Sequence, residues 1–184
     1  MNTLYLLNLH PEVMDKLTTQ LRALVRDRPD YDAAVLESCP LVDRVLLESL
    51  RYYAPVPLFF RNVRKDRPAR LADRDLPPDP VVAVVVRGVH RSARYWKDSD
   101  RFDPNRWAGG AAAAGLEGDT FFPFGRGPRA CVGAEFAMFC LRVMLATLLS
   151  RARGDIDPNT PYRQFFHCGV GEPKHIMGRF VPHQ

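Results

Sequence analysis

Paired cysteines, dense basic clusters and long apolar runs are all missing from this sequence of 184 residues. Its four cysteines form no C-x-x-C pair, which argues against a zinc site, and they suggest no disulfide framework, so a reducing compartment is the default. The basic residues are dispersed, and a net charge of +5 spread in this way does not imply nucleic-acid binding. No stretch reads as a signal peptide or as a membrane-spanning helix.

The composition that remains is that of a globular chain. Apolar and charged residues make up 46% and 26% of the sequence, which allows a sizeable core. Helix signals occur over residues 4–9, 11–27, 31–38 and 40–53. In the second of these helices the apolar residues recur on one face, at Val13, Leu17, Leu21, Leu24 and Val25. Residues 57–63 and 81–86 are strand candidates, and the second, rich in β-branched residues, is expected to be buried.

The stretch from Phe121 to Gly133, here called the cysteine loop, is the most constrained part of the chain. Prolines restrict its backbone, and the glycines at positions 125, 127 and 133 permit positive φ and close backbone approach. Apolar residues then recur at helical spacing, at Phe136, Ala137, Cys140, Leu141, Met144, Leu145 and Leu148. Cys131 is therefore expected near the positive end of an apolar helix, where a thiolate is favoured over a thiol.

Three interpretations of this loop are open from the residues alone. It fits a glycine-rich turn before a core helix, with Cys131 as a small buried side chain. It also fits G-x-G-x-x-A through Gly125, Gly127 and Ala130, the pattern of a dinucleotide-binding loop. That pattern needs flanking strands, whereas the proline before the glycines is poor strand material and residues 151–158 read as loop. The third interpretation is a loop that presents a cysteine ligand to haem iron.

The third interpretation comes from a resemblance to the cysteine-ligand loop of cytochrome P-450. The motif F-x-x-G-x-R-x-C-x-G is matched at every fixed position, by Phe124, Gly127, Arg129, Cys131 and Gly133. The resemblance implies haem b as cofactor, with the Cys131 thiolate as axial ligand of the iron. It also implies that Arg129 binds a haem propionate, that Phe124 shields the sulfur from water, and that Gly125 and Gly133 let backbone amides approach the sulfur.

A second part of the resemblance concerns three charged residues. Glu48 and Arg51 form an E-x-x-R pair on one side of a predicted helix, and taken alone such a pair is usually an exposed salt bridge. Residues 102–107 resemble the family's P-E-R-F segment, with asparagine and tryptophan in place of glutamate and phenylalanine, and they keep Arg106. The resemblance implies that Glu48, Arg51 and Arg106 form a buried structural cluster that holds the cysteine loop in register.

Three single positions complete the site expectations. Arg61, ten residues after Arg51, matches a second family position that contacts a haem propionate; taken alone, it is a surface arginine at a sheet edge. Asp79 stands in a turn where the family has glycine, and aspartate tolerates the left-handed geometry expected there. His90 is expected to pack or to hydrogen-bond rather than to bind iron.

The expected fold class is mainly α with a small β-sheet (α+β), as in the C-terminal portion of the cytochrome P-450 fold. The chain is expected to form one unit, residues 1–184, with parts at residues 1–54, 55–107, 108–133 and 134–184. The small-residue stretch 108–118 is expected to be mobile, and the tail from residue 155 to form a hairpin with its loop at residues 169–171.

By resemblance, the parent activity is monooxygenation: dioxygen is split with two electrons and protons, and one oxygen atom enters a C–H bond of an apolar small molecule. A reductase or ferredoxin would supply the electrons. The alternatives are a peroxide-rearranging haem-thiolate isomerase or dehydratase, and a non-catalytic truncated paralogue. No acid–alcohol pair for proton delivery precedes Leu4. The chain is therefore expected to lack the oxygen-activation helix, to hold haem poorly by itself and to turn over no substrate.

Overall fold

A computed structural model describes most of the chain. The described residues are 1–25, 36, 38–64, 66, 70–109, 120–157, 163–167, 170–174 and 176–183. Almost all of the helix predicted over residues 31–38 lies outside them, as do most of the stretch 108–118 and Cys168. Within the described residues, helices and short antiparallel strands make an α+β fold, which is the predicted class.

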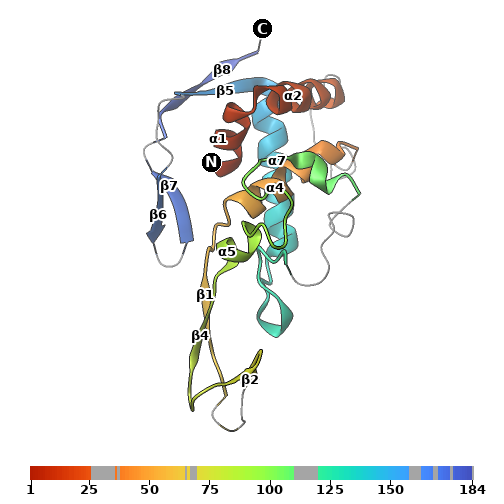
Figure 1. The fold of residues 1–184 in the computed structure, drawn as a ribbon. Helices are drawn as coiled ribbons and strands as arrows, with labels where there is room; N and C mark the ends of the chain where they lie inside the picture. The colour runs from red at the N-terminus through yellow and green to blue at the C-terminus, as the bar shows by residue number, and fades with distance from the viewer. Residues whose placement is uncertain are drawn as a thin grey trace.

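Helices form the larger part of the fold. They are α1 (Asn2–Leu9), α2 (Pro11–Val25), α4 (Pro40–Tyr52), α5 (Val86–His90) and α7 (Ala134–Arg151), with 3-10 turns η1 (Pro104–Trp107) and η2 (Gly127–Arg129). Pro11 and Pro40 each begin a helix, where the missing amide proton costs nothing and the fixed φ suits the helix. In Figure 1, α1, α2, α4 and α7 pack together, and α5 lies below them beside the strands.

One apolar core lies between these four helices. From α2, the side chains of Met14, Leu17 and Leu21 are buried in it. Val13 and Leu24, two residues of the predicted stripe, pack at its margin. The predicted inward face of α4 is confirmed, since that helix is buried at Leu41, Val45, Leu46, Ser49 and Leu50.

α7 is apolar on more than one side, and only part of its predicted apolar set is buried. Leu145 lies in the core with Ala146 and Leu149, whereas Phe136 and Met144 are 72% and 60% exposed. Because apolar residues occur all round the helix, the 3.6-residue period does not by itself select the buried face. Packing against α2 and α4 selects it. None of the helices in the described part of the chain has the length and hydropathy needed to cross a membrane.

In the described part of the chain, the strands form four separate antiparallel pairs. They are β1 (Phe59–Asn62) with β4 (Val81–Val84), β2 (Arg70–Leu71) with β3 (Arg74–Asp75), β5 (Ala152–Ile156) with β8 (Gly178–Pro182), and β6 (Arg163–His167) with β7 (Val170–Lys174). The prediction of a buried strand over residues 81–86 is wrong, because β4 alternates between exposed and half-buried positions and α5 begins at Val86. A ladder of two strands is too small to bury both of its faces. Asp79, before β4, has φ 57°, the left-handed geometry predicted for it.

The C-terminal strands correct another prediction. Residues 151–158 were expected to be loop, but residues 152–156 form β5, which pairs with β8 so that Ile156 lies opposite Gly178. Glycine and aspartate within β5 weaken its local strand signal, and pairing with a segment distant in the sequence overrides that signal. The predicted tail hairpin is present as β6 and β7, with His167 opposite Val170. Its predicted loop at residues 169–171 is placed too late, because Val170 and Gly171 are the first residues of β7.

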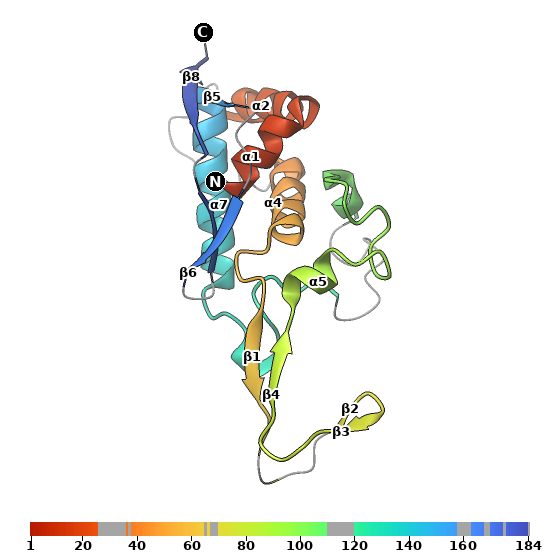
Figure 2. The same ribbon diagram turned by 60° about the vertical axis from the view of Figure 1, so that its left-hand side comes forward.

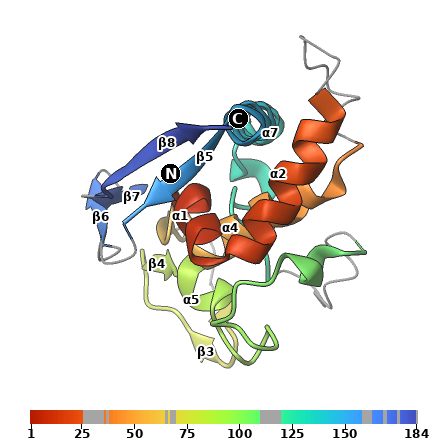
Figure 3. The same ribbon diagram turned by 90° about the horizontal axis from the view of Figure 1, so that it is seen from above.

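The cysteine loop leads into α7 at the end of that helix opposite to β5. Figures 1 and 2 both show the segment before α7 beside the β1–β4 ladder and α5, below the helical core. Seen along the vertical axis in Figure 3, the β5–β8 pair and the β4–α5 segment lie on different sides of α1. Three stretches of the sequence, carried by α4, by β1 to α5 and by the cysteine loop, therefore meet in one region.

Candidate functional site

A fully buried carboxylate organises the charged residues of this region. Glu48, on α4, accepts two hydrogen bonds of 2.9 Å from Nε and Nη2 of Arg51, and one of 3.0 Å from Nε of Arg106. The Asp103 amide and the Trp107 indole N–H donate to it as well, both at 2.9 Å. The structure thus brings the three predicted charged residues together, with the pairing that a buried charge requires.

Arg51 joins this carboxylate to the segment between α5 and η1. Its buried guanidinium also donates to the carbonyls of His90, Ser99 and Arg101, at 2.9, 2.8 and 3.0 Å. Together with the two bonds to the carboxylate, these contacts use all five N–H donors of the arginine fork. A lysine ammonium has three donors and no planar fork, so this position requires arginine.

His90, the last residue of α5, contacts the cysteine loop. Its ring is fully buried, and its Nε2 accepts the amide N–H of Phe122 at 3.0 Å. Burial, and then the charge of Arg51, lower the pKa of His90 to about 4, against a smaller opposing effect of the Leu50 carbonyl. The imidazole is therefore neutral near pH 7. The prediction that His90 packs or hydrogen-bonds is confirmed.

Acid is expected to destabilise the protein through His90. An imidazole in the unfolded chain titrates near 6.5, so between 6.5 and about 4 the unfolded state binds more protons than the folded state. The free energy of unfolding should therefore fall by about 2 kcal/mol through this residue when the pH drops from about 7 to about 5. Urea unfolding of the wild type and of His90→Gln at both pH values measures this change in the free energy of unfolding. Equal pH dependence in the two proteins would contradict the neutral, buried imidazole.

The cysteine loop is held by its own backbone. The Phe124 carbonyl accepts the Cys131 amide at 2.8 Å, and the Phe122 carbonyl accepts the Gly125 amide at 3.0 Å. Gly125 and Gly127 have φ values of 74° and 68°, in the left-handed region that favours glycine. Glycine is therefore the residue that adopts the loop backbone at these two positions with least strain.

Cys131 is exposed just before α7. Gly133 is the N-cap of that helix, with φ −93°, so it does not use the positive φ that glycine permits, and the Ala134 amide lies 3.4 Å from the Cys131 carbonyl. The thiol thus lies at the positive end of an 18-residue helix, as predicted. Cys39 differs because it is buried and desolvation raises its pKa. Cys140 is half-buried on α7.

A cavity of about 360 Å³ opens at Cys131. Two arginines line it from different elements, Arg61 from β1 and Arg129 from η2, together with Phe124. The Arg61 guanidinium lies over the Phe59 ring, 4.2 Å from the ring centroid, which packs the side chain against β1. Phe59 lines the cavity as well, and the other described lining residues are Leu50, Pro55, Val56, Val86, Phe122, Pro123 and Gly125. The structure therefore places one thiol and two cations around a mostly apolar cavity.

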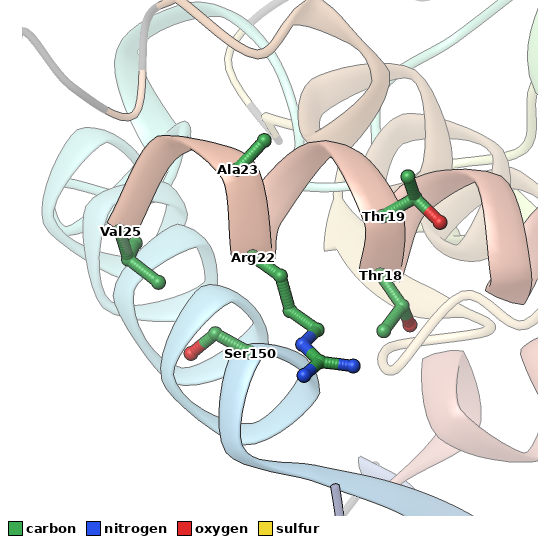
Figure 4. A pocket seen from close by; sticks show the side chains of 6 residues that line it. All are labelled: Thr18, Thr19, Arg22, Ala23, Val25 and Ser150. Atoms are coloured by element: carbon green, nitrogen blue, oxygen red, sulfur yellow. The ribbon is translucent and has the colours of Figure 1, made fainter. Parts of the chain in front are cut away.

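A larger pocket, of about 590 Å³, lies between α2 and α7. Figure 4 shows the six side chains that line it, with Arg22 extending from α2 toward α7. Its described lining residues are Thr18, Thr19, Arg22, Ala23, Val25 and Ser150. Among them are hydroxyl groups and one cation, but no thiol, imidazole or carboxylate. The cavity at Cys131 is therefore the candidate site.

Comparison with known proteins identifies the family. The family model described as Cytochrome P450 matches residues 1–175. This chain belongs to the cytochrome P450 family. Cytochrome P450 CYP72A616 from Paris polyphylla is 32% identical to it over 159 residues, and Pentalenene oxygenase from Streptomyces avermitilis is 31% identical over 177 residues. The resemblance stated from the motifs is confirmed.

The P450 relatives are much longer than this chain. The two matches cover 85% and 96% of this chain but 30% and 38% of the relatives. The crystal structure of the cytochrome P450DA heme domain has a TM-score of 0.90 to this fold at 21% identity, covering 100% of this chain and 40% of that domain. The chain thus spans between 30% and 40% of the length of these P450 proteins.

The P450 motifs predicted the charged cluster but not all of its contacts. Neither the Asp103 amide nor the Trp107 indole was expected to reach Glu48. A signal for the second was present, because the tryptophan that replaces the family's phenylalanine adds an N–H donor. The contact between His90 and Phe122 was missed because the two residues lie 32 positions apart and no local pattern links them.

Proposed function

We propose that this chain binds haem b at the Cys131 cavity and forms part of a haem-thiolate monooxygenase site. The observation that carries the proposal is the convergence of one exposed thiol with Arg61 and Arg129 at a mostly apolar cavity. A thiolate is a known axial ligand of haem iron, and a guanidinium is the side chain best suited to pair with a carboxylate. Family membership supports the same function.

The residues at the cavity fit iron protoporphyrin in their chemistry. Cys131 would supply the axial thiolate, and Arg61 and Arg129 would pair with the two propionates. Phe124 would cover the sulfur, and apolar side chains from α4, β1 and α5 would contact the macrocycle. A thioether-linked haem is disfavoured because the sequence contains no C-x-x-C-H motif, whereas haem b needs no such motif.

Bound haem would supply the activation of dioxygen and the transfer of one oxygen atom to a C–H bond of an apolar small molecule. The chain's own residues hold and tune that group. The Cys131 thiolate, just before α7, would donate electron density to that group. The buried cluster of Glu48, Arg51 and Arg106 fixes α4 to the segment before η1. α4 carries Leu50, which is part of the cavity wall. The proposal includes a reductase or ferredoxin as electron donor, and the net charge of +5 suits an acidic one.

The protein that contains this chain is expected to retain haem and to oxygenate an apolar substrate. The purified haem-loaded protein is given an electron-donor protein, NADPH and a panel of fatty acids and terpenes under isotopically labelled dioxygen. The expected product gains one labelled oxygen atom, because one atom of dioxygen enters the substrate and the other leaves as water. Mass spectrometry of the products measures this incorporation.

Two controls make this experiment decisive. Arg22→Ala, in the pocket between α2 and α7, should leave haem content and product unchanged, because Arg22 does not line the Cys131 cavity. Rearrangement or dehydration of an added fatty-acid hydroperoxide without any electron donor, with no oxygenation of the panel, would replace the monooxygenase by the isomerase or dehydratase alternative. Protein that folds but takes up no haem would contradict both.

A further inference from the structure

We infer that His90 is a positioning residue, whose ring nitrogen Nε2 holds the Phe122 amide and thereby fixes how the cysteine loop presents Cys131. The inference concerns the haem-thiolate site and so rests on the proposed function. His90 is not among the described residues that line the cavity, and its ring makes no contact with the Glu48 carboxylate in the hydrogen bonds described above. Its part would be to connect the charged cluster to the loop.

On the cluster side, His90 is anchored at its backbone and at its ring. Arg51 Nη1 donates to its carbonyl at 2.9 Å, and Arg51 is itself held by Glu48. The imidazole packs against the rings of Phe121 and Trp96, with centroid distances of 5.1 and 6.5 Å. Because the residue is fully buried, the ring cannot turn into solvent. The position of Nε2 is therefore fixed relative to α4.

On the loop side, a short series of hydrogen bonds leads from the imidazole to the cysteine. Nε2 accepts the Phe122 amide, and the Phe122 carbonyl accepts the Gly125 amide, each at 3.0 Å. The residue before Gly125 is Phe124, whose carbonyl accepts the Cys131 amide at 2.8 Å. Anchoring Phe122 therefore sets the register of the first half of the loop, and that half in turn holds the backbone of Cys131.

The contact requires an acceptor at Nε2. A neutral imidazole with its proton on Nδ1 provides one, whereas an imidazolium would present a second donor to the Phe122 donor. Glutamine can place an acceptor oxygen near the Nε2 position, while phenylalanine fills the ring volume without any acceptor. His90→Gln and His90→Phe therefore separate hydrogen bonding from packing.

The test compares the haem-loaded wild type, His90→Phe and His90→Gln by the spectrum of the reduced carbon-monoxide complex. His90→Phe is expected to lower about tenfold the ratio of the complex that has the Cys131 thiolate as ligand to the complex that has lost it. This is the change expected for one buried amide left without its hydrogen bond. His90→Gln is expected to restore most of that ratio. Far-UV circular dichroism and haem content are measured on the same samples, so that loss of fold is distinguished from loss of the thiolate.

Two results would overturn the inference. If His90→Phe keeps the wild-type ratio, the hydrogen bond does not position the loop. If His90→Gln is impaired as much as His90→Phe, ring packing and not the acceptor matters. A wild type that folds and shows no thiolate-type spectrum would instead contradict the proposed function.

A measurement on the wild type alone keeps the inference testable if His90→Phe fails to fold. Nitrogen-15 NMR of the haem-free protein, or of the diamagnetic reduced carbon-monoxide complex, reports which ring nitrogen carries the proton. The inference requires a neutral ring with Nε2 unprotonated near pH 7. A proton on Nε2 would overturn it whatever the variants show, because the Phe122 amide would then face a donor.

Discussion

Replacing Cys131 by serine is expected to abolish the thiolate-type Soret band of the reduced carbon-monoxide complex. A serine hydroxyl is a far weaker donor than a thiolate, so the iron would lose the electron density on which that band depends. Cys131 is the exposed thiol at the start of α7, and it shares its cavity with Arg61 and Arg129. Difference spectroscopy of the haem-loaded variant and wild type measures the change.

The matched control is Cys140→Ser, which changes the same atom nine residues further along the chain. Cys140 is half-buried on α7 and does not line the cavity, so the band should remain. Cys168→Ser, at a position outside the described residues, is also expected to keep it. A wild-type band in Cys131→Ser would contradict the assignment of the ligand, and loss of the band in Cys140→Ser alone would move the ligand to α7.

Local signals predicted those elements in which several signals agree. α4 was predicted because a proline start, an inward apolar face and the spacing of Glu48 and Arg51 all point to one helix. β5 was not, because its strand depends on pairing with β8, a segment distant in the sequence. The buried face of α7 was not predicted either, since a helix that is apolar on several sides takes its orientation from the elements packed against it.

The same distinction holds within the candidate site. Phe124, Arg129 and Cys131 lie in one short loop, so their spacing in the sequence already places them together. Arg61 reaches the cavity from β1, outside that loop; its spacing from Arg51 suggested this place only through the family resemblance, and taken alone it was a surface arginine. His90 needed the fold as well, because its acceptor role depends on a backbone amide, and every residue type except proline supplies one.

Replacing Glu48 by alanine is expected to lower the free energy of unfolding by about 3–5 kcal/mol. The carboxylate is fully buried and accepts hydrogen bonds from two arginines, the Asp103 amide and the Trp107 indole. Without it, the guanidinium of Arg51, also fully buried, keeps its charge but loses its counter-charge. A loss of this size is a large part of the roughly 5–15 kcal/mol that stabilises a typical domain, so the yield of folded, haem-loaded protein should collapse.

The matched control for Glu48→Ala is Asp15→Ala, which removes the carboxylate from an exposed pair. Asp15 lies 3.1 Å from Arg153, with side chains 63% and 49% exposed, so its loss should cost about 0–1 kcal/mol. Urea unfolding of both variants compares the loss of a buried ion pair with the loss of an exposed one. The two pairs have nearly equal lengths, since Arg51 Nε lies 2.9 Å from Glu48 Oε2. Equal losses would mean that water reaches Glu48 and that the cluster does not hold α4 to the segment before η1.

Because Arg51 also anchors the His90 carbonyl, Glu48→Ala should loosen the cysteine loop in whatever protein remains folded. Its remaining carbon-monoxide complex is therefore expected to show the same loss of thiolate ligation as His90→Phe, while that of Asp15→Ala stays as in the wild type.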